Sequence, residues 1–416
     1  MSGALDIPAF RDARSSYPWL VRGMNAVGKI LPASWLGLKP ISADAIWDAA
    51  RKGDLAEREP APEAAKALDV LVESLVKNVD LTPLGQFSAL DDTVRMARTH
   101  LRIHAALEAT PEIRGTELPP PIFILGWPRT GSTFLHQLLG ADPAARTIPY
   151  WESFDPVPPL AGKPDRRAEK LEKMLGQLRF IAPGYDAIHP MAPNMTEECV
   201  ALFMNAFRTL QFDFQYRIPE YANWLLGEDA NVAYEAHLRQ LELIQFHRPH
   251  GAYQILKDPT HLIHFETIVA RYPDAKFILT HRDPAESLSS MCSLVAYTRS
   301  LFTEEVDPQL IGAELLSGYW PKALERSRKI REQIPQGQVV DVLHADLRRD
   351  PLGTAASIYE TLQVPFVEQT SAEMHRHLGE VEATPSGKHS HSLEGFGLTR
   401  GQVRERLEGY CEEVGV

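Results

Sequence analysis

Four short apolar runs, each followed by a stretch typical of a helix, constrain what this chain of 416 residues can fold into. The runs are PIFILGW at Pro121–Trp127, YQILKD at Tyr253–Asp258, KFILTHR at Lys276–Arg282 and QVVDVLHAD at Gln338–Asp346. Runs of this length predict buried strands, and strands that alternate with helices predict a parallel sheet with helices on both faces. We therefore expect an α/β fold whose ligands bind at the carboxyl ends of the strands.

The chain before the first run has a different pattern. Residues 1–116 are expected to be helical, because Pro62–Val79 and Leu90–Ala109 repeat apolar side chains at helical spacing. The segment ELPPP at Glu117–Pro121 then breaks this pattern. We interpret residues 1–116 as an N-terminal helical region and candidate substrate cap, and residues 117–416 as the α/β domain.

A long insertion, residues 150–251, separates the first two runs and is rich in aromatic residues. Most of these side chains are expected to pack between helices. An insertion at the ligand-binding edge of such a sheet also often forms a lid or a wall for the substrate. We predict this role for the helical insertion.

Composition limits the classes of partner. The net charge of −12 argues against a nucleic-acid partner, which needs a basic face, but not against a small anionic ligand. The three cysteines lie far apart and no His/Cys cluster has metal-ligand spacing, so no bound metal is expected. No apolar run is long enough to span a membrane, and the first residues do not resemble a secretory signal, so we expect a cytoplasmic protein.

One apolar segment, Tyr17–Leu38, is interrupted by Arg22, Lys29 and Pro32. It could make a peripheral contact with a membrane surface as an amphipathic segment. Packing on the protein's own core or on a substrate channel is favoured over that interpretation. The sequence does not indicate an oligomeric state.

The first predicted strand runs into a loop with the spacing of a phosphate loop. Nucleoside triphosphatases have the pattern G-x-x-x-x-G-K-[ST]. Here Gly126, Gly131 and Thr133 keep this spacing, but Ser132 stands in place of the lysine. Backbone N–H groups and a helix that starts near Ser132 can still form an anion cradle, to which Arg129 adds a positive charge. We therefore favour a three-layer, P-loop-like fold with an anion-binding loop over a glycine turn without a ligand.

Basic residues also end the later strands. Lys257 ends the second run, in LKDPTHL, and Arg282 ends the third, in THRDPAESLSS. If a helix starts near Pro284, Ser290 lies about two turns along it, so Arg282 and Ser290 could together hold a second phosphate. An isolated HRDP sequence more commonly makes a surface salt bridge. His281 is expected to point away from such a ligand, because neighbouring side chains on a strand face opposite sides.

Four segments together, PRTGSTFLHQLL, LKDPTHL, THRDPAESLSS and the tail GKHSHSLEGFGLT, resemble the sulfotransferases that use 3′-phosphoadenosine 5′-phosphosulfate (PAPS). The similarity is to the bacterial branch of that superfamily and, in the KDP motif, to the tyrosylprotein sulfotransferases. It covers about residues 117–400. It implies transfer of a sulfuryl group from PAPS to a hydroxyl of a small acceptor, with 3′,5′-diphosphoadenosine (PAP) as the other product and no metal.

The resemblance also implies roles for individual residues. The 5′-phosphosulfate loop would consist of Arg129, Thr130, Gly131, Ser132 and Thr133. Arg282 and Ser290 would hold the 3′-phosphate, and Lys257 would contact the sulfuryl group or the bridging oxygen. Lys388 and His389 would lie near the nucleotide or the sulfate.

One position departs from the pattern of the relatives. Some of them place a further arginine four residues after the serine of the arginine–serine pair, and this chain has Leu294 there. The contacts to the 3′-phosphate are therefore not all carried over by the resemblance.

Sulfuryl transfer is expected to proceed by in-line displacement, in which positioning and electrostatic stabilisation do most of the work. Arg129 and Lys257 would stabilise the charge on the equatorial and leaving oxygens. A carboxylate base would remove the proton of the acceptor hydroxyl. We select Glu152, in IPYWESF, because the tyrosylprotein sulfotransferases carry a catalytic glutamate after the first helix of the fold. The alternatives are Glu197 and Glu198, in HPMAPNMTEE, and His189.

The acceptor is expected to be an apolar or amphipathic alcohol or phenol, because the insertion is aromatic and the N-terminal helices are apolar. Two other functions stay open. A nucleotide kinase or other triphosphatase with a deviant loop would need the missing lysine and an acidic magnesium ligand, for which Asp258 and Asp346 are the candidates. A non-catalytic nucleotide-binding member of the same fold is the second alternative, which the retained basic residues disfavour.

Overall fold

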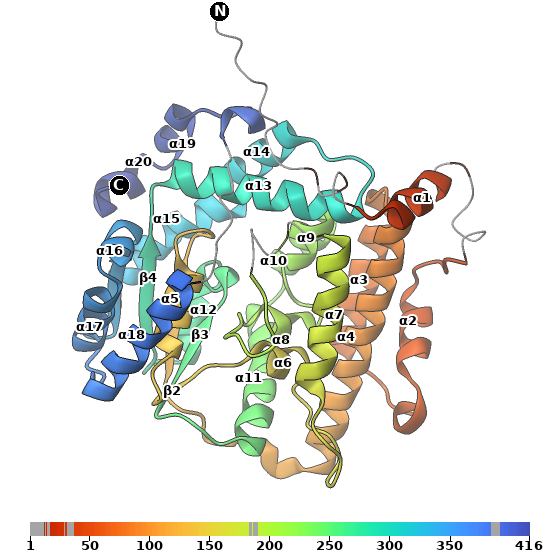
Figure 1. The fold of residues 1–416 in the computed structure, drawn as a ribbon, viewed down its shortest axis with the longest axis horizontal. Helices are drawn as coiled ribbons and strands as arrows, with labels where there is room; N and C mark the ends of the chain where they lie inside the picture. Colours follow the sequence, from red (N-terminus) through yellow and green to blue (C-terminus); the bar gives the residue numbers. More distant parts are fainter. Residues whose placement is uncertain are drawn as a thin grey trace, which may run out of the picture.

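The computed structural model of the protein describes residues 12, 14, 17–28, 30, 37–182, 185, 190–383 and 392–416. Its centre is a parallel sheet of five strands in the order β2-β3-β1-β4-β5. The strands are β1 (Pro121–Gly126), β2 (Ala145–Arg146), β3 (Tyr253–Lys257), β4 (Lys276–His281) and β5 (Val339–Leu343). Figure 1 shows the sheet on one side of the molecule, with the N-terminal helices on the other.

The helices surround this sheet and extend it into a helical half. Those up to the start of β3 are α1 (Trp19–Gly28), α2 (Ala43–Ala50), η3 (Gly53–Leu55), α3 (Pro62–Asn78), α4 (Pro83–Ala109), η4 (Pro111–Ile113), α5 (Ser132–Gly140), α6 (Tyr150–Phe154), α7 (Arg167–Ile181), α8 (Val200–Met204), α9 (Gln211–Tyr216), α10 (Pro219–Gly227) and α11 (Ala230–His247). Those after β3 are η5 (Pro259–Leu262), α12 (Phe265–Arg271), α13 (Pro284–Phe302), α14 (Pro308–Ser317), α15 (Tyr319–Arg331), α16 (His344–Arg349), α17 (Pro351–Thr361), α18 (Glu368–Ala383), η6 (Glu394–Phe396), α19 (Arg400–Arg406) and α20 (Glu408–Val414).

Both faces of the sheet are buried. Ile124 of β1 belongs to a buried cluster that includes side chains of α5, α17 and α18. Its neighbour Phe123 belongs to a second cluster, which includes side chains of α8, α11 and α12. Successive residues of the strand therefore face different helical layers, which is why the sequence shows a continuous apolar run there.

The register of the central strand decides what lies near the end of the sheet. β1 pairs with β3 on one side, where Ile124 is opposite Lys257. It pairs with β4 on the other side, where Gly126 is opposite Thr280. The loop that follows Gly126 therefore begins between the carboxyl ends of β3 and β4.

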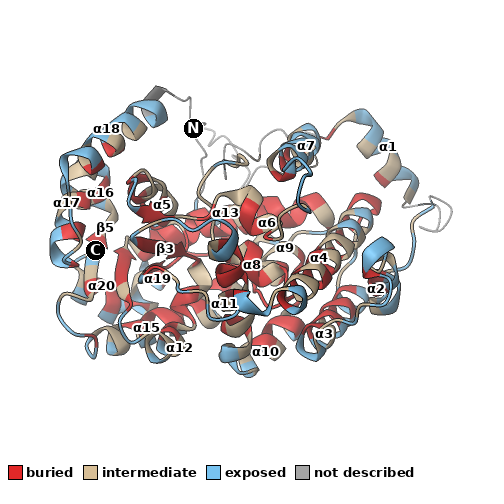
Figure 2. Cartoon of the chain, turned by 90° about the horizontal axis from the view of Figure 1, so that it is seen from below, coloured by how far each residue is buried: buried red, intermediate tan, exposed pale blue. Residues whose placement is uncertain are grey.

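The N-terminal helices pack on the helical insertion and on α13. One buried cluster contains side chains of α2, α3 and α4 together with side chains of α10, α13, α14 and α19. Figure 2 shows α13 as buried along almost all of its length, and Figure 1 shows it running from above β4 toward α1. Within the described ranges, no helix is long and apolar enough to cross a membrane.

The predicted α/β fold is confirmed, since the central sheet is parallel and has helices on both faces. All four predicted strands are present, and α5 and α13 begin at the expected residues, Ser132 and Pro284. The strand β2 has no counterpart in the prediction, because a strand of two residues has no periodicity to detect.

Candidate active site

The loop between β1 and α5 has the backbone shape of an anion cradle. Arg129 and Gly131 both have positive φ angles, of 72° and 86°, and α5 begins directly after Gly131. A positive φ is strained for arginine, and such strain is typical of functional loops. A Cβ atom on Gly131 would also lie 2.8 Å from Cδ2 of His344. Left-handed residues in a loop that opens a helix gather backbone N–H groups around an anion.

Thr130 anchors this loop to the sheet. Its hydroxyl lies 2.8 Å from the carbonyl oxygen of Trp127 and 2.7 Å from Oγ1 of Thr280, and the residue is 1% exposed. A Cβ atom on Gly126 would lie 2.2 Å from the same Thr280 hydroxyl. The side chain of Thr130 is therefore committed to the sheet, and the residue can offer a ligand its backbone N–H group.

Two guanidinium groups meet beside the loop. Nε of Arg129 donates a hydrogen bond of 3.0 Å to the Ser290 hydroxyl, and Nη1 of Arg282 donates one of 3.0 Å to the carbonyl oxygen of Arg129. Burial lowers the pKa of Arg129, and the charge of Arg282 lowers it further. Glu286 forms an ion pair of 3.1 Å with Arg282. The structure thus brings Arg129, Arg282 and Ser290 together, although Ser290 is bound to Arg129 and not to Arg282.

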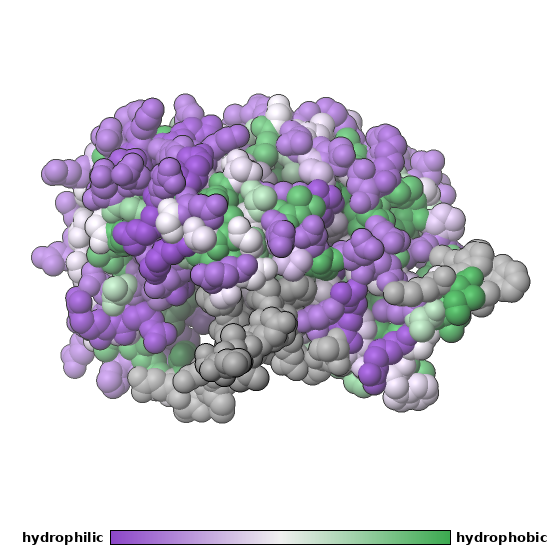
Figure 3. Space-filling view, turned by 90° about the horizontal axis from the view of Figure 1, so that it is seen from above, coloured by the Kyte–Doolittle hydropathy of each residue, from purple (hydrophilic) through white to green (hydrophobic). Residues whose placement is uncertain are grey.

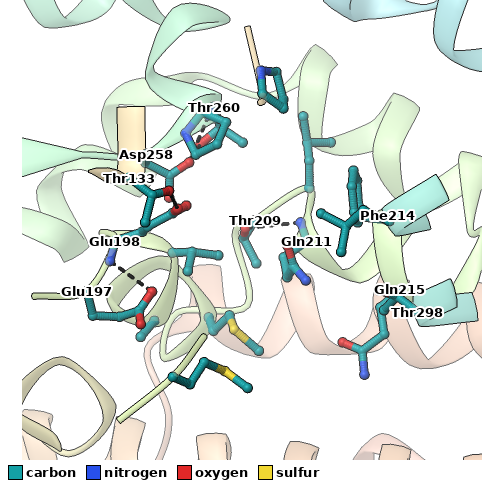
Figure 4. A pocket seen from close by; sticks show the side chains of 18 of the residues that line it. Thr133, Glu197, Glu198, Thr209, Gln211, Phe214, Gln215, Asp258, Thr260 and Thr298 are labelled. Carbon is teal, nitrogen blue, oxygen red and sulfur yellow. Dashed lines mark hydrogen bonds between the residues drawn. The ribbon is translucent and has the colours of Figure 1, made fainter. Parts of the chain in front are cut away.

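Lys257 lies at the end of β3, close to the other end of the loop. It is 3% exposed, and its Nζ forms an ion pair with Glu198 and lies 3.3 Å from the hydroxyl of Thr133. That hydroxyl donates a hydrogen bond of 3.4 Å to the Glu198 carboxylate (Figure 4). A buried ammonium, a carboxylate and a loop hydroxyl therefore form one contact group.

Backbone hydrogen bonds hold Glu198 at this place. The N–H group of Glu197 donates to the carbonyl oxygen of Ile148 over 2.9 Å, and the N–H group of Cys199 donates to the carbonyl oxygen of Lys257 over 2.8 Å. Glu198 lies between these two bonds. Its position beside Lys257 is therefore fixed by contacts with two distant parts of the chain.

The neighbouring acids differ in their protonation. Burial and then the charge of Glu198 raise the pKa of Glu197 to about 8, and the Glu197 carboxyl accepts a hydrogen bond of 2.9 Å from the N–H group of Glu198. Burial and then Glu198 also raise the pKa of Asp258 to about 6. Asp258 accepts bonds of 2.8 and 2.6 Å from the N–H group and hydroxyl of Thr260. At neutral pH, Glu197 therefore holds a proton, whereas Glu198 carries the charge that faces Lys257.

These groups open onto a cavity of about 460 Å³. Loop residues, among them Ser132 and Thr133, line it together with the ends of the strands. Figure 4 shows Glu197 and Glu198 on one side of the cavity, with Phe214 on the opposite side. Apolar side chains that line the cavity include Phe154, Leu178, Met204, Phe214, Leu294 and Phe302. The cavity thus joins a polar end to a mostly apolar wall.

Two charged residues of α4, Asp92 and Arg95, also line this cavity. The guanidinium of Arg95 lies 3.8 Å from the centre of the Phe154 ring and 3.7 Å from an oxygen of Asp92. Nε of Arg95 is buried without a hydrogen-bond partner. The N-terminal helical region therefore adds two charged side chains to a mostly apolar wall.

Glu152 does not line the cavity. Its carboxylate is 2% exposed and pairs with Arg146 at 2.9 Å and with Arg248 at 3.1 Å. On the short helix α6, Tyr150 and Phe154 line the cavity, and a residue midway between two that share a helix face points elsewhere. This geometry disfavours Glu152 as the base. Glu197, Glu198 and Asp258 are the carboxylates that line the cavity beside Lys257, and Glu198 is the one that pairs with its ammonium.

Sequence reasoning missed His344 as a site residue. It begins α16 directly after β5, so it stands at the carboxyl end of a strand, and it lines the cavity. Burial lowers its pKa to about 4, which leaves the ring neutral at pH 7. Its place at the end of QVVDVLHAD was the signal that could have identified it. His281 instead contacts Asp341 and Tyr410, at 3.0 and 3.2 Å, as its place on the strand predicted.

Three of the predicted positions, Lys388, His389 and His189, lie outside the described residues. Among the residues that the structure describes, no group of three His, Cys, Asp or Glu side chains could hold a metal ion.

The parallel sheet and the anion-binding loop after its first strand define a P-loop-like α/β protein. Within that class, the chain belongs to the sulfotransferase family, because a model of that family matches residues 120–368. The matched range begins just before β1 and includes the loop, Lys257, Arg282 and Ser290.

Similar proteins are known from mycobacteria. The crystal structures of sulfotransferase STF1 from Mycobacterium tuberculosis and of STF9 from Mycobacterium avium are 29% and 26% identical, with TM-scores of 0.76 and 0.77. Each covers 89% of this chain, and the matches span 100% and 96% of those chains. Omega-hydroxy-beta-dihydromenaquinone-9 sulfotransferase Stf3 of Mycobacterium bovis is 25% identical over 252 residues, which is 58% of this chain. The match spans 62% of the length of that curated relative.

Proposed function

We propose that this protein transfers the sulfuryl group of PAPS to a hydroxyl group of a small apolar or amphipathic acceptor. The observation that carries this proposal is the convergence of three basic residues on one loop. Lys257 reaches the loop at Thr133, and Arg282 reaches it at Arg129, four residues earlier. Positive charge at two points of one cradle suits a donor with two separate anionic groups, as PAPS has.

The residues fit the donor in charge and in backbone shape. The N–H groups of the loop, with Ser132 and Thr133, would hold the 5′-phosphosulfate at the start of α5. Arg282 and Ser290 would bind the 3′-phosphate, and Ser290 also holds the guanidinium of Arg129 at the loop. A role for Lys388 and His389 at the nucleotide rests on the family resemblance.

The chain's own groups can support an in-line transfer. The donor supplies an activated sulfuryl group. Lys257 and Arg129 would stabilise the negative charge on the oxygens around sulfur and on the leaving oxygen. A carboxylate of the Glu197–Glu198 pair would take the proton of the acceptor hydroxyl, because both line the cavity next to Lys257.

The cavity wall supports an apolar or amphipathic acceptor. Its surface is mostly apolar, and Asp92 and Arg95 add a polar patch from the N-terminal helical region. This contribution supports the proposal that residues 1–116 cap the substrate and that the insertion forms an acceptor wall. The name of the Stf3 relative, an omega-hydroxy-beta-dihydromenaquinone-9 sulfotransferase, supports a hydroxyl acceptor with a large apolar body.

A peripheral membrane contact is a further proposal for the segment that contains α1. Trp19 is 73% exposed, and Figure 3 shows hydrophobic side chains of α1 at the surface. The inner side of α1 packs on a cluster that includes Leu178, Leu294 and Phe302, which also line the cavity. An apolar acceptor held in a membrane could enter beside this helix.

The proposal is tested by calorimetric titration with PAP, followed by transfer of labelled sulfate from PAPS to a panel of hydroxyl acceptors. We expect micromolar binding of PAP and transfer to apolar alcohols or phenols. Binding without transfer would favour a non-catalytic nucleotide-binding protein, and absence of binding would contradict the assigned donor. Magnesium-dependent turnover of ATP would support the kinase alternative, which Ser132 in place of lysine disfavours.

A further inference from the structure

The Glu198 carboxylate occupies the contacts that a sulfuryl group in the loop would need. It pairs with Lys257 and accepts a hydrogen bond of 3.4 Å from Thr133. Lys257 and Thr133 are themselves 3.3 Å apart. In the proposed function, these same two groups face the sulfuryl end of the donor. The carboxylate and the donor therefore compete for one ammonium and one hydroxyl.

The charges of Lys257, Glu198 and the donor are the cause of this competition. Lys257 is 3% exposed, and a buried ammonium needs an anionic partner. Glu198 also acts on Arg129, because its negative charge favours the charged form of that guanidinium. Two anions cannot share these cations at close range without mutual repulsion. When a negatively charged donor enters the loop, the Glu198 carboxylate has to leave Lys257.

The geometry gives the displaced side chain a place to go. Backbone bonds from Glu197 to Ile148 and from Cys199 to Lys257 hold the main chain on both sides of Glu198. The side chain can turn while these bonds persist. Glu198 lines the cavity in which the acceptor is proposed to bind, and the neighbouring Glu197 is neutral, so Glu198 is the charged member of this pair.

We propose that Glu198 has two successive roles: it holds Lys257 until the donor binds, and after the donor displaces it, it becomes the base that deprotonates the acceptor. This inference rests on the proposed function. The acceptor oxygen forms a bond to sulfur as the bond between sulfur and the bridging oxygen of the donor breaks. The proton passes from the acceptor hydroxyl to Glu198, and the electron pair of the broken bond stays on the phosphate oxygen beside Lys257.

This dual role predicts opposite effects on binding and turnover. Glu198→Gln removes the competing charge and keeps the size of the side chain. Its affinity for PAPS should rise about five- to tenfold, because the state in which Lys257 is occupied no longer reduces the competent fraction. The gain should be smaller for PAP, which lacks the sulfuryl group. Turnover should fall by about 10²–10⁴-fold, because the base is lost. If the carboxylate had a merely structural role, its removal would not increase the affinity for the donor.

The experiment is a calorimetric titration of wild type and Glu198→Gln with PAPS and with PAP, combined with transfer assays. Glu152→Gln is the matched control, because it removes a buried carboxylate that does not line the cavity, and its PAPS affinity should equal that of wild type. Unchanged or weaker PAPS binding by Glu198→Gln, or retained turnover, overturns the inference. If wild type binds neither nucleotide, the proposed function itself fails.

A second variant, Glu198→Ala, should show the same two changes, a higher affinity for PAPS and a lower turnover. Either variant leaves Lys257 without its buried partner and should lower the thermal unfolding temperature. PAPS supplies the missing anion, so it should raise that temperature more in the variants than in wild type. A variant that is unfolded and that PAPS does not restore contradicts the inference.

Discussion

Arg129 and Ser290 are 161 positions apart in the chain, yet Nε of Arg129 donates a hydrogen bond of 3.0 Å to the Ser290 hydroxyl. Ser290 lies on the buried helix α13, and Arg129 belongs to the strained loop after β1. A rigid helix thereby orients the guanidinium of a loop residue. The other end of the same residue, its carbonyl oxygen, accepts a bond from Arg282. Arg129 is thus fixed at both ends before any ligand is bound.

This arrangement predicts graded losses of donor affinity. Arg129→Ala should weaken PAPS binding about 10- to 100-fold, because a hydrogen bond to a charged group contributes about 1.5–3 kcal/mol. Ser290→Ala keeps the charge of Arg129 and should weaken PAPS binding only about three- to tenfold. Calorimetric titration checks both values, and Arg129→Lys separates the charge from the forked geometry of the guanidinium. Full affinity in Arg129→Ala would exclude this loop as the donor site.

Glu152 is expected to act on stability. It is 2% exposed and neutralises Arg146, which is also buried. Removing one partner of a buried ion pair typically costs about 3–5 kcal/mol, and we expect the lower end because Arg248, the second partner, is half exposed. Glu152→Gln should therefore lower the free energy of unfolding in urea by about 3 kcal/mol and leave turnover within about twofold at a temperature where the variant is folded. A loss of turnover without a loss of stability would return Glu152 to the role of base.

Sequence periodicity was sufficient to predict the strands and the strand ends that carry the basic residues. Apolar runs identify buried strands, and in a parallel sheet their carboxyl ends meet at one edge. This is why the sequence alone predicts that Arg129, Lys257 and Arg282 lie near one another. The register of β1 with β3 and β4 then explains their contacts with the loop.

The direction of side chains outside the sheet could not be predicted in the same way. Glu152 and Glu198 are both acidic residues of the insertion, and no local pattern tells them apart. Glu198 faces Lys257 because of backbone bonds to Ile148 and Lys257, which are distant in sequence. Glu152 faces two arginines because Tyr150 and Phe154 occupy the cavity side of α6. Both outcomes depend on tertiary contacts.

Arg95 is expected to influence the choice of acceptor. Its guanidinium lies on the Phe154 ring, and the residue lines the cavity. An acceptor with a second oxygen function could accept a hydrogen bond from this guanidinium, which is worth about tenfold or more in affinity. Arg95→Met keeps the apolar stem, so it should raise KM about tenfold for such acceptors and leave KM for simple apolar alcohols unchanged. PAPS affinity, measured in parallel, should not change, and an equal loss for all acceptors would contradict this role.

Glu197 should give the folded protein a pH dependence of defined sign. Its pKa is raised to about 8 in the folded state by burial and by Glu198, whereas an unfolded glutamate has a pKa of about 4.3. Between these values the folded chain holds a proton that the unfolded chain has released, so the contribution of Glu197 to stability falls as the pH rises.

Glu197→Gln removes this titration and keeps an uncharged side chain of similar size. The unfolding temperature of the variant minus that of wild type should therefore increase between pH 5 and pH 8, by a few degrees. Taking this difference at each pH cancels other titrating groups such as Asp258, whose own pKa is raised to about 6. Thermal unfolding followed by circular dichroism at closely spaced pH values provides the measurement. A difference that stays constant or decreases over this range would mean that Glu197 is ionised beside Glu198 at neutral pH, and the Glu197–Glu198 pair would then carry two charges, not one.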